Sequence, residues 1–283
     1  MKIIKSNEIK NDILKNIKYC NKKKSLLIIS QNNDLAVNQY KNAIIRRCNE
    51  FNIDYIDKEF SKEDNHLDII NYCNNLNDID GFIVLQPLLE STDLDYLREN
   101  IPFNDLDGFK YDSLGKIMNK KFENLPQTVK SIIKFINYMN LDLEGKDIII
   151  ANSTNVIGKP LAMYLNYKKA SVTLFNSKTK NQKEKIKNCD IFISAIGKAN
   201  YYNKDYFRNG QIIIDAGVSF VDGNMYGDVD YEDIKDLDIK IVTCKNGVGS
   251  ITTLSLLESL LYNWKAFIFL YGIIIKWFKM AKI

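Results

Sequence analysis

Short, nearly all-apolar runs alternate with amphipathic stretches along most of the chain. Apolar runs of this kind are typical of strands that are buried on both faces of a parallel sheet. The intervening stretches place apolar residues three and four positions apart, which is the spacing of one helical face. The alternation predicts an α/β protein with a parallel sheet covered by helices.

The alternation falls into two series. The first series predicts strands at Leu26–Ser30, Asp54–Ile56 and Gly81–Leu85, and helices at Asn7–Tyr19, Asp34–Phe51 and His66–Cys73. A helix over Val129–Met139 then connects to the second series, which starts at Gly145. The second series predicts strands at Lys146–Ala151, Ser171–Phe175, Asp190–Ala195, Gln211–Asp215 and Lys240–Val242, with a helix at Leu161–Tyr167. Strand, loop and helix units of this length indicate a doubly wound, Rossmann-like nucleotide-binding domain.

Ligands of doubly wound sheets bind beyond the carboxyl ends of the strands, so the loops that follow each strand are the first candidates for a site. The loop after the first strand contains Asn152, Ser153, Thr154, Ile157 and Gly158. It leads into a helix whose free N–H groups and dipole suit a pyrophosphate. It lacks the Gly-x-Gly-x-x-Gly pattern of dinucleotide sites, so an ordinary strand-to-helix loop is the competing interpretation.

Three further loops add candidates for cofactor binding. The loop after the second strand carries Ser177 and Lys178 where NAD-binding domains usually place an acidic residue. These two side chains suit a 2′-phosphate, which favours NADP and leaves NAD as the alternative. The loops after the third and fourth strands contain small residues that allow close approach to a cofactor, namely Ala195, Gly197, Gly217 and Val218.

Composition removes several functional classes. The 39 basic and 35 acidic residues are too evenly balanced to suggest a nucleic-acid partner. The only histidine, His66, lies in a polar stretch and is expected at the surface. Because the chain has a single histidine, a multi-histidine metal site is excluded, and no metal is expected. The five scattered cysteines predict free thiols and a cytoplasmic protein. The apolar stretch Ala266–Ile275 is too short to span a bilayer, so we expect a packed C-terminal helix, with a membrane-surface tail as the alternative.

Read in order, several motifs resemble one known family. They are Asn155 to Pro160, Ile214 to Val218, Gly227 to Val229, and Gly247 to Gly249 followed by Thr252, together with Asp34 to Ala36, Tyr40, Val84 to Leu88 and Asn104 to Phe109. In this order and at this spacing they resemble the methylenetetrahydrofolate dehydrogenase/cyclohydrolase family. The resemblance covers nearly the whole chain.

The resemblance implies NADP-linked oxidation of 5,10-methylenetetrahydrofolate, followed by hydrolysis of the methenyl product, in a homodimer. It implies a folate-site domain of residues 1–139 with a returning helix over 253–283, and an NAD(P)-binding domain of residues 140–252. It also assigns folate binding to Tyr40, Pro87, Asp107, Gly249 and Thr252, with Tyr40 stacking on the aminobenzoyl ring and Asp107 binding the pterin. Tyr40 and Asp107 would form the catalytic site; a helix-surface tyrosine and a turn carboxylate are the competing interpretations.

The chain departs from the family pattern at the hydrolytic site. The family has a catalytic lysine one turn after the tyrosine, where this chain has Ile44, and a glutamine where this chain has Leu85. Gln86 is displaced by one residue, which on a strand turns its side chain to the opposite face. The cofactor loop also differs, because Ser153 replaces an arginine. Ile44 and Leu85 favour a dehydrogenase with weak or lost cyclohydrolase activity, whereas Ser153 weighs against the preference for NADP.

Two alternatives stay open at this point: a binding protein without turnover, or another NAD(P)-dependent oxidoreductase on the same scaffold.

Overall fold

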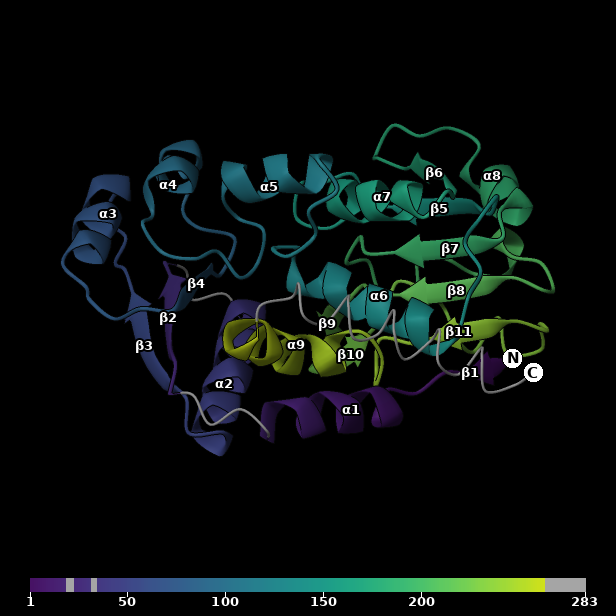
Figure 1. Ribbon diagram of the computed structural model, residues 1–283. Coiled ribbons are helices and arrows are strands. Elements are labelled where there is room, and N and C mark those ends of the chain that lie inside the picture. The colour runs from purple at the N-terminus through teal and green to yellow at the C-terminus, as the bar shows by residue number, and fades with distance from the viewer. Residues whose placement is uncertain (19–22, 32–34, 263–283) are drawn as a thin grey trace. The chain divides into compact units, whose positions relative to one another are not determined.

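The computed structural model describes residues 1–18, 23–31 and 35–262 (Figure 1). The chain divides into two units, Met1–Leu14 with Pro126–Ser255 and Lys15–Leu125 with Leu256–Ile283, and each is described here by itself. Predictions that concern Tyr19, Cys20, Asp34 and the stretch 264–283 lie outside the described residues.

The first unit is built on a six-stranded parallel sheet in the order β1-β11-β8-β7-β5-β6. Its strands are β1 (Lys2–Ile3), β5 (Asp147–Ala151), β6 (Ser171–Leu174), β7 (Ile191–Ser194), β8 (Ile212–Asp215) and β11 (Lys240–Val242). Its helical elements are α6 (Gln127–Tyr138), α7 (Gly158–Tyr167), α8 (Gln182–Asn188), the 3₁₀ turn η1 (Lys204–Tyr206) and the start of α9 (Gly249–Leu261). Helix α7 runs beside β5 and β6 (Figure 1).

Without β1, the strands follow the doubly wound order 2-1-3-4-5. In that order the connections reverse direction between the first and third strands, which here are β5 and β7. The sheet is buried on both faces because the apolar runs are continuous: Ile148 and Ile150 face one side, and Ile149 and Ala151 pack in a core cluster on the other. The predicted α/β fold class is confirmed.

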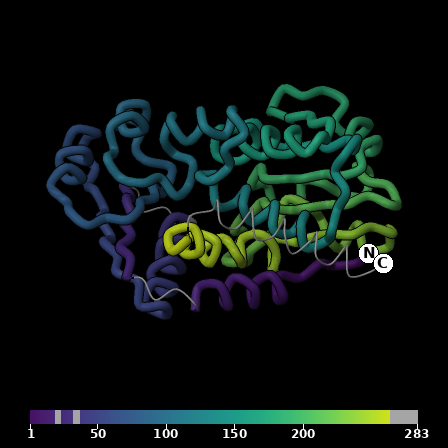
Figure 2. The backbone as a smooth tube through the Cα atoms, viewed as in Figure 1, coloured from purple at the N-terminus to yellow at the C-terminus, as the bar shows by residue number. Residues whose placement is uncertain are grey.

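The division of the chain differs from the predicted domain boundaries at two places. The N-terminal residues join the first unit because β1 pairs with β11; the N–H of Lys2 donates to Ile239 O at 2.7 Å and that of Ile4 to Ile241 O at 2.8 Å (Figure 2). Two residues of strand are too short to leave a periodic signal in the sequence. Helix α6 also belongs to this unit, whereas the sequence placed Val129–Met139 with the folate-site domain.

The first unit also contains a small antiparallel hairpin. Its strands are β9 (Ser219–Val221) and β10 (Asn224–Tyr226), and they form a separate two-stranded sheet. Phe220, Val221 and Tyr226 are exposed on it. The sequence analysis did not predict this hairpin.

The second unit has a three-stranded parallel sheet in the order β3-β2-β4. Its elements are β2 (Ser25–Ser30), β3 (Asp54–Glu59), β4 (Gly81–Val84), α2 (Leu35–Glu50), α3 (His66–Asn74), α4 (Leu94–Asn100) and α5 (Tyr111–Met118). The central strand β2 is buried on both faces, because Leu26, Leu27, Ile28 and Ile29 are all inaccessible to solvent. Strand β3 continues past the predicted end at Ile56, since pairing with β2 extends through its polar half.

Two helices from the ends of the described chain meet in the second unit. Helix α1 (Asn7–Lys18) contributes Asn16, whose Nδ2 donates to Glu258 of α9 at 2.8 Å. The hydroxyl of Tyr262 donates to the carbonyl of Asn16 at 2.7 Å. The C-terminal half of α9 therefore packs against the end of α1.

Candidate functional site

Neighbouring strands bring two of the predicted cofactor loops together. Asn152 follows β5 and Ala195 follows β7, and these strands are adjacent in the sheet. The Asn152 Nδ2 donates to the carbonyl of Ala195 at 2.7 Å. Both residues stand at the position where the strand order reverses, which is the usual ligand site of such sheets.

The loop after β5 is organised by one side chain. Asn152 Oδ1 accepts hydrogen bonds from Thr154 N at 2.9 Å, Thr154 Oγ1 at 2.8 Å and Gly158 N at 3.0 Å. Ile157 N donates to Thr154 Oγ1, and Lys159 N donates to Thr154 O. The prediction of free N–H groups at this helix start is therefore wrong, because Asn152 and Thr154 already pair them.

Gly158 permits the close approach of α7 to β5. A Cβ atom at this position would stand 2.0 Å from the carbonyl oxygen of Asn152, which is impossible without movement of the backbone. This is the close helix–strand packing for which dinucleotide-binding folds use glycine. Ser153 is half-buried in the same loop.

The loop after β6 is an exposed turn. Lys178 N donates to Asn176 Oδ1, and Asn176 N donates to Thr179 Oγ1, both at 2.9 Å. These backbone bonds leave Ser177 and Lys178 exposed at the turn. The pair is therefore accessible to a ligand phosphate from solvent.

The loops after β7 and β8 lie against each other. Gly197 has a φ of +65°, a conformation that glycine adopts at little cost. A Cβ atom on Gly197 would lie 3.7 Å from the carbonyl oxygen of Val218, so the two loops are in contact. Ala195 is buried and Val218 is exposed, which gives this corner of the site a mainly backbone and aliphatic surface.

Two fully buried carboxylates stand behind these loops. Asp215 ends β8 and accepts hydrogen bonds from Gly217 N at 3.0 Å and from the Tyr231 hydroxyl at 2.6 Å. Asp228 accepts from the Ser194 hydroxyl at 2.6 Å. Burial raises the pKa of Asp215 to about 7; the hydrogen bond from Tyr231 opposes this rise and the charge of Asp228 adds to it.

The loop after β11 leads into α9 through a tight turn. A Cβ atom on Gly247 would stand 1.7 Å from the carbonyl oxygen of Thr243, so the turn requires glycine. The Thr252 hydroxyl donates to Gly249 O at 2.8 Å within the first turn of α9. Gly249 is exposed and Thr252 is buried.

In the second unit, Tyr40 and Asp107 interact. Burial raises the pKa of the Tyr40 phenol well above its ordinary value, and the carboxylate of Asp107 raises it further. The phenol therefore stays protonated at neutral pH. That Tyr40 and Asp107 form a folate site stays a prediction.

A neighbouring carboxylate shapes the loop of Asp107. Asp105 is buried and accepts hydrogen bonds from Asp107 N and Lys110 N, both at 2.9 Å. Its segment pairs with β4 through Phe82. A Cβ atom on Gly81 would stand 2.7 Å from Leu106, so glycine makes room for this pairing.

The residues that follow β4 differ in their exposure to solvent. Leu85 is buried, whereas Gln86 and Pro87 are exposed. The Gln86–Pro87 peptide bond is cis. Gln86 is therefore accessible to solvent, whereas Leu85 is not.

The basic residues of α2 near Tyr40 are engaged elsewhere. Ile44 is fully buried and carries no polar atom. Lys41 is buried against β3, where its Nζ lies 2.6 Å from Glu59 and 3.7 Å from Asp57. Arg47 pairs with Glu50 on the same helix.

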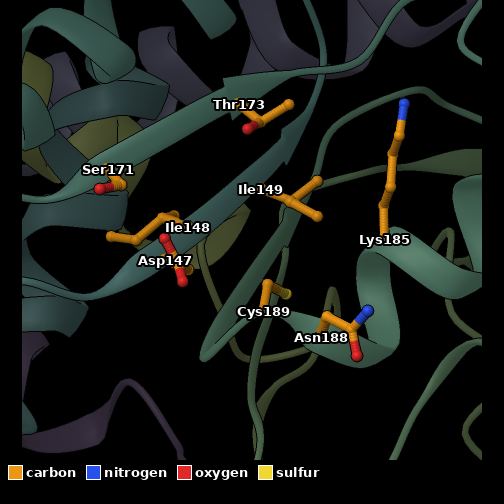
Figure 3. A pocket seen from close by; sticks show the side chains of 8 residues that line it. All are labelled: Asp147, Ile148, Ile149, Ser171, Thr173, Lys185, Asn188 and Cys189. Atoms are coloured by element: carbon orange, nitrogen blue, oxygen red, sulfur yellow. The ribbon is translucent and has the colours of Figure 1, made fainter.

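A hollow of about 290 Å³ lies in the first unit (Figure 3). It is lined by Asp147, Ile148, Ile149, Ser171, Thr173, Lys185, Asn188 and Cys189. These residues belong to β5, β6 and the end of α8, and Asp147 and Ser171 start their strands. The hollow therefore does not include the carboxyl ends of the strands, where the predicted cofactor residues lie.

His66 is half-buried rather than fully exposed. It starts α3, its Nδ1 accepts a hydrogen bond from Asp93 N at 3.4 Å, and its ring lies 5.1 Å from that of Tyr96. Cys48, Cys73, Cys189 and Cys244 are free and buried. Among the described helices, none has the length and apolar character needed to cross a bilayer.

The parallel sheet, its reversal point and the glycine-dependent loops define a two-domain α/β protein of the dinucleotide-binding class. The NAD(P)-binding domain model of tetrahydrofolate dehydrogenase/cyclohydrolase matches residues 126–267, and the catalytic domain model of the same family matches residues 4–107. The chain belongs to the tetrahydrofolate dehydrogenase/cyclohydrolase family.

Similar proteins agree with this assignment. The bifunctional protein FolD of Fusobacterium nucleatum is 34% identical over 82% of this chain and 84% of its own length. FolD of Caldanaerobacter subterraneus is 32% identical over 92% and 94%. The crystal structure of FolD from Campylobacter jejuni, titled a methylenetetrahydrofolate dehydrogenase/cyclohydrolase, has a TM-score of 0.81 at 26% identity and covers 92% of this chain and 96% of that one.

The polar residues that support the loops were not predicted from the sequence. Asp105, Ser194 and Tyr231 were given no role, and Asp215 and Asp228 were noted only as parts of motifs. The signal in the sequence was a glycine close to each of Asp215 and Asp228, because a glycine beside a buried carboxylate often leaves room for it. Such a contact between distant segments cannot be read from spacing alone.

The raised pKa of Asp215 predicts a pH-dependent contribution to stability. Between about pH 4 and about pH 7 the folded protein binds a proton that the unfolded chain releases, so this contribution falls as the pH rises and is lost above that range. Denaturant unfolding at about pH 5 and about pH 8 should show that the wild type loses about 2 to 3 kcal/mol more than Asp215→Asn, which cannot titrate. Equal losses in the two proteins would contradict the assignment.

Proposed function

We propose that this protein is an NADP-dependent 5,10-methylenetetrahydrofolate dehydrogenase with weak or absent methenyltetrahydrofolate cyclohydrolase activity. Family membership supports the folate substrate and the dinucleotide. The observation that carries the second half of the proposal is the fully buried Ile44 one helical turn after Tyr40. A binding protein without turnover would bind NADP but would not reduce it when methylenetetrahydrofolate is supplied. A dehydrogenase of another substrate would reduce NADP only with that substrate.

The residues after β5, β6, β7 and β8 fit a dinucleotide. Asn152, Ala195 and Gly197 lie at the reversal point of the sheet, and Gly158 brings the start of α7 close to β5. The exposed Ser177 and Lys178 supply a hydroxyl and a positive charge for a 2′-phosphate. Ser153 stands where the family has an arginine, so the 2′-phosphate would depend more strongly on Lys178. When bound, the nicotinamide accepts the hydride.

In the second unit, Tyr40 and Asp107 would hold the folate. The protonated phenol of Tyr40 offers a face for stacking on the aminobenzoyl ring, and Asp107 offers acceptors to the pterin N–H groups. Hydride transfer requires the substrate carbon to be positioned, and the folate nitrogen stabilises the developing cation. Hydride transfer therefore needs no protein base. A chain with isoleucine in place of lysine at position 44 can still perform it.

Hydrolysis of the methenyl product makes a different demand. It needs an activated water molecule and proton transfers, which a positioned acid–base group typically accelerates by about 10²- to 10⁴-fold. Ile44 and Leu85 are apolar, and Lys41 is held by Glu59 and Asp57 on β3. Arg47 is a poor base because a guanidinium group stays protonated. These observations support the loss of the hydrolytic step.

The exposed hairpin supports a homodimer. Phe220, Val221 and Tyr226 are exposed on a two-stranded sheet whose strands have open edges. Short isolated ribbons are marginally stable in water, and open edges readily pair with another chain. We infer that a second copy of the chain covers this hairpin.

The free, buried cysteines support a reducing compartment, so we place the enzyme in the cytoplasm.

The cofactor preference can be tested at Lys178. We expect the wild type to reduce NADP with a higher kcat/KM than NAD when methylenetetrahydrofolate is the substrate. Lys178→Glu should lower kcat/KM for NADP about tenfold or more, because it replaces attraction to the 2′-phosphate with repulsion. Lys180→Glu, on an exposed lysine of the same connection, is the control for general charge. An unchanged NADP preference in Lys178→Glu would contradict the assigned contact.

The loss of cyclohydrolase activity can be tested with methenyltetrahydrofolate alone. We expect the wild type to hydrolyse it no faster than buffer does. Ile44→Lys should not restore the activity while Leu85 remains, and should lower stability because it buries a charge. Rapid hydrolysis by the wild type would contradict the proposal, and its loss in Lys41→Met would identify Lys41 as a substitute base.

The homodimer can be tested by light scattering after size-exclusion chromatography. We expect the wild type to have the mass of a dimer and Val221→Lys to shift it towards the monomer, since the substitution places a charge in the covered hairpin. Met118→Lys, at an exposed position of α5, should leave the dimer intact. A monomeric wild type, or a Val221→Lys protein that stays dimeric, would rule out this interface.

A further inference from the structure

Buried polar groups connect the loops that follow three strands of the first unit. The groups are the carboxylates of Asp215 and Asp228, which are fully inaccessible to solvent, and the partly buried hydroxyl of Tyr231. Burying a carboxylate is costly unless hydrogen bonds replace its hydration. The donors that replace it here come from the loops themselves, so the arrangement couples the carboxylates to loop geometry.

Asp228 holds the loop after β7. Its Oδ2 accepts from Ile196 N at 2.7 Å, and its Oδ1 accepts from Lys198 N at 2.8 Å. These two N–H groups flank Gly197, which is in the left-handed conformation. The Ser194 hydroxyl, at the end of β7, also donates to Asp228 Oδ2. One carboxylate therefore fixes both ends of the backbone segment that would face the dinucleotide.

Tyr231 holds the loop after β11 through the same network. Its hydroxyl donates to Asp215 Oδ2 at 2.6 Å and accepts from Cys244 N at 2.8 Å. Cys244 precedes the turn at Gly247 that leads to Gly249. The phenol oxygen is thus a bridge between the end of β8 and the loop that carries a predicted folate-binding residue.

Asp215 joins the two branches. Its Oδ1 accepts from Asp228 N at 3.2 Å, and its Oδ2 accepts from Val229 N at 3.0 Å. The close approach is possible only with glycine at two positions. A Cβ atom on Gly217 would stand 2.1 Å from the carboxylate of Asp228, and one on Gly227 would stand 2.1 Å from that of Asp215.

The opposite end of β8 provides a comparison. Gln211 is buried just before this strand, and its Nε2 donates to the carbonyls of Ile186 at 2.6 Å and Cys189 at 3.0 Å. Its Oε1 accepts from Arg208 N. This network is as buried as that of Asp215, but its partners lie outside the predicted cofactor and folate loops.

We propose that Asp228 and Tyr231 are separate positioning residues for the two ligands, with Asp228 setting the dinucleotide loop after β7 and Tyr231 setting the folate-side loop after β11. This inference rests on the proposed function. Neither residue needs to touch a ligand, because each acts through backbone N–H groups. The two branches predict different defects when they are broken one at a time.

Ligand binding to the full-length protein separates the branches without turnover. Isothermal titration would measure Kd for NADP and for 5-formyltetrahydrofolate, a stable reduced folate. Asp228→Asn places an amide against donors, and we expect Kd for NADP to rise about tenfold or more while Kd for the folate changes less than about threefold. Tyr231→Phe should show the reverse pattern. Ser194→Ala keeps the carboxylate and should raise Kd for NADP by about threefold.

Thermal unfolding and one control complete the test. Gln211→Met should lower the melting temperature and leave both Kd values unchanged, which separates positioning from general stability. If Asp228→Asn does not fold, Ser194→Ala carries the dinucleotide arm. Wild-type protein that binds neither NADP nor NAD would overturn the proposed function together with this inference. A different result is that the wild type binds while Ser194→Ala and Tyr231→Phe keep its Kd values, or change them in the same way as Gln211→Met does. That result would overturn this inference and leave the proposed function standing.

Discussion

The predicted cofactor loops depend on the hydrogen bonds to one carboxylate, that of Asp215, which is buried at the end of β8. Its oxygen atoms accept hydrogen bonds from backbone N–H groups and a phenol. Because every one of these donors belongs to a loop that follows a strand, the sheet and the loops cannot move independently. Asn152 performs a similar task beside β5 with an uncharged side chain. The binding surface is therefore set by groups that lie behind it.

The proposed loss of the hydrolytic step requires no change of fold in the second unit. Position 44 lies on the buried side of α2, where an isoleucine packs at no electrostatic cost. Lys41, the lysine of the same helix turn, forms an ion pair with Glu59 on β3. Tyr40 and Asp107, the groups proposed to position the folate, interact with each other. Positioning and proton transfer thus depend on different residues, so one can be lost while the other is kept.

Much of the fold follows from the sequence, because continuous apolar runs such as Ile148–Ile150 can be buried only in a parallel sheet covered on both faces. Their order, and the small residues after each strand, also led to the prediction of a cofactor site at the carboxyl ends of the strands. The two-residue strand β1 and the hairpin β9–β10 were missed because they are too short for a periodic signal. The free N–H groups expected before α7 were wrong for another reason: Asn152 and Thr154 compete for them, and side-chain competition is invisible in a spacing pattern.

The most direct measurement of the central claim is the product balance of the dehydrogenase reaction. Purified protein would be given methylenetetrahydrofolate and NADP, and methenyltetrahydrofolate and NADPH would be quantified together over time, with the methenyl compound in protein-free buffer as the reference. A dehydrogenase without Lys at position 44 should accumulate the two products in equal amounts, apart from the loss seen in buffer. NADPH formation with no methenyl accumulation, and 10-formyltetrahydrofolate in its place, would contradict the account.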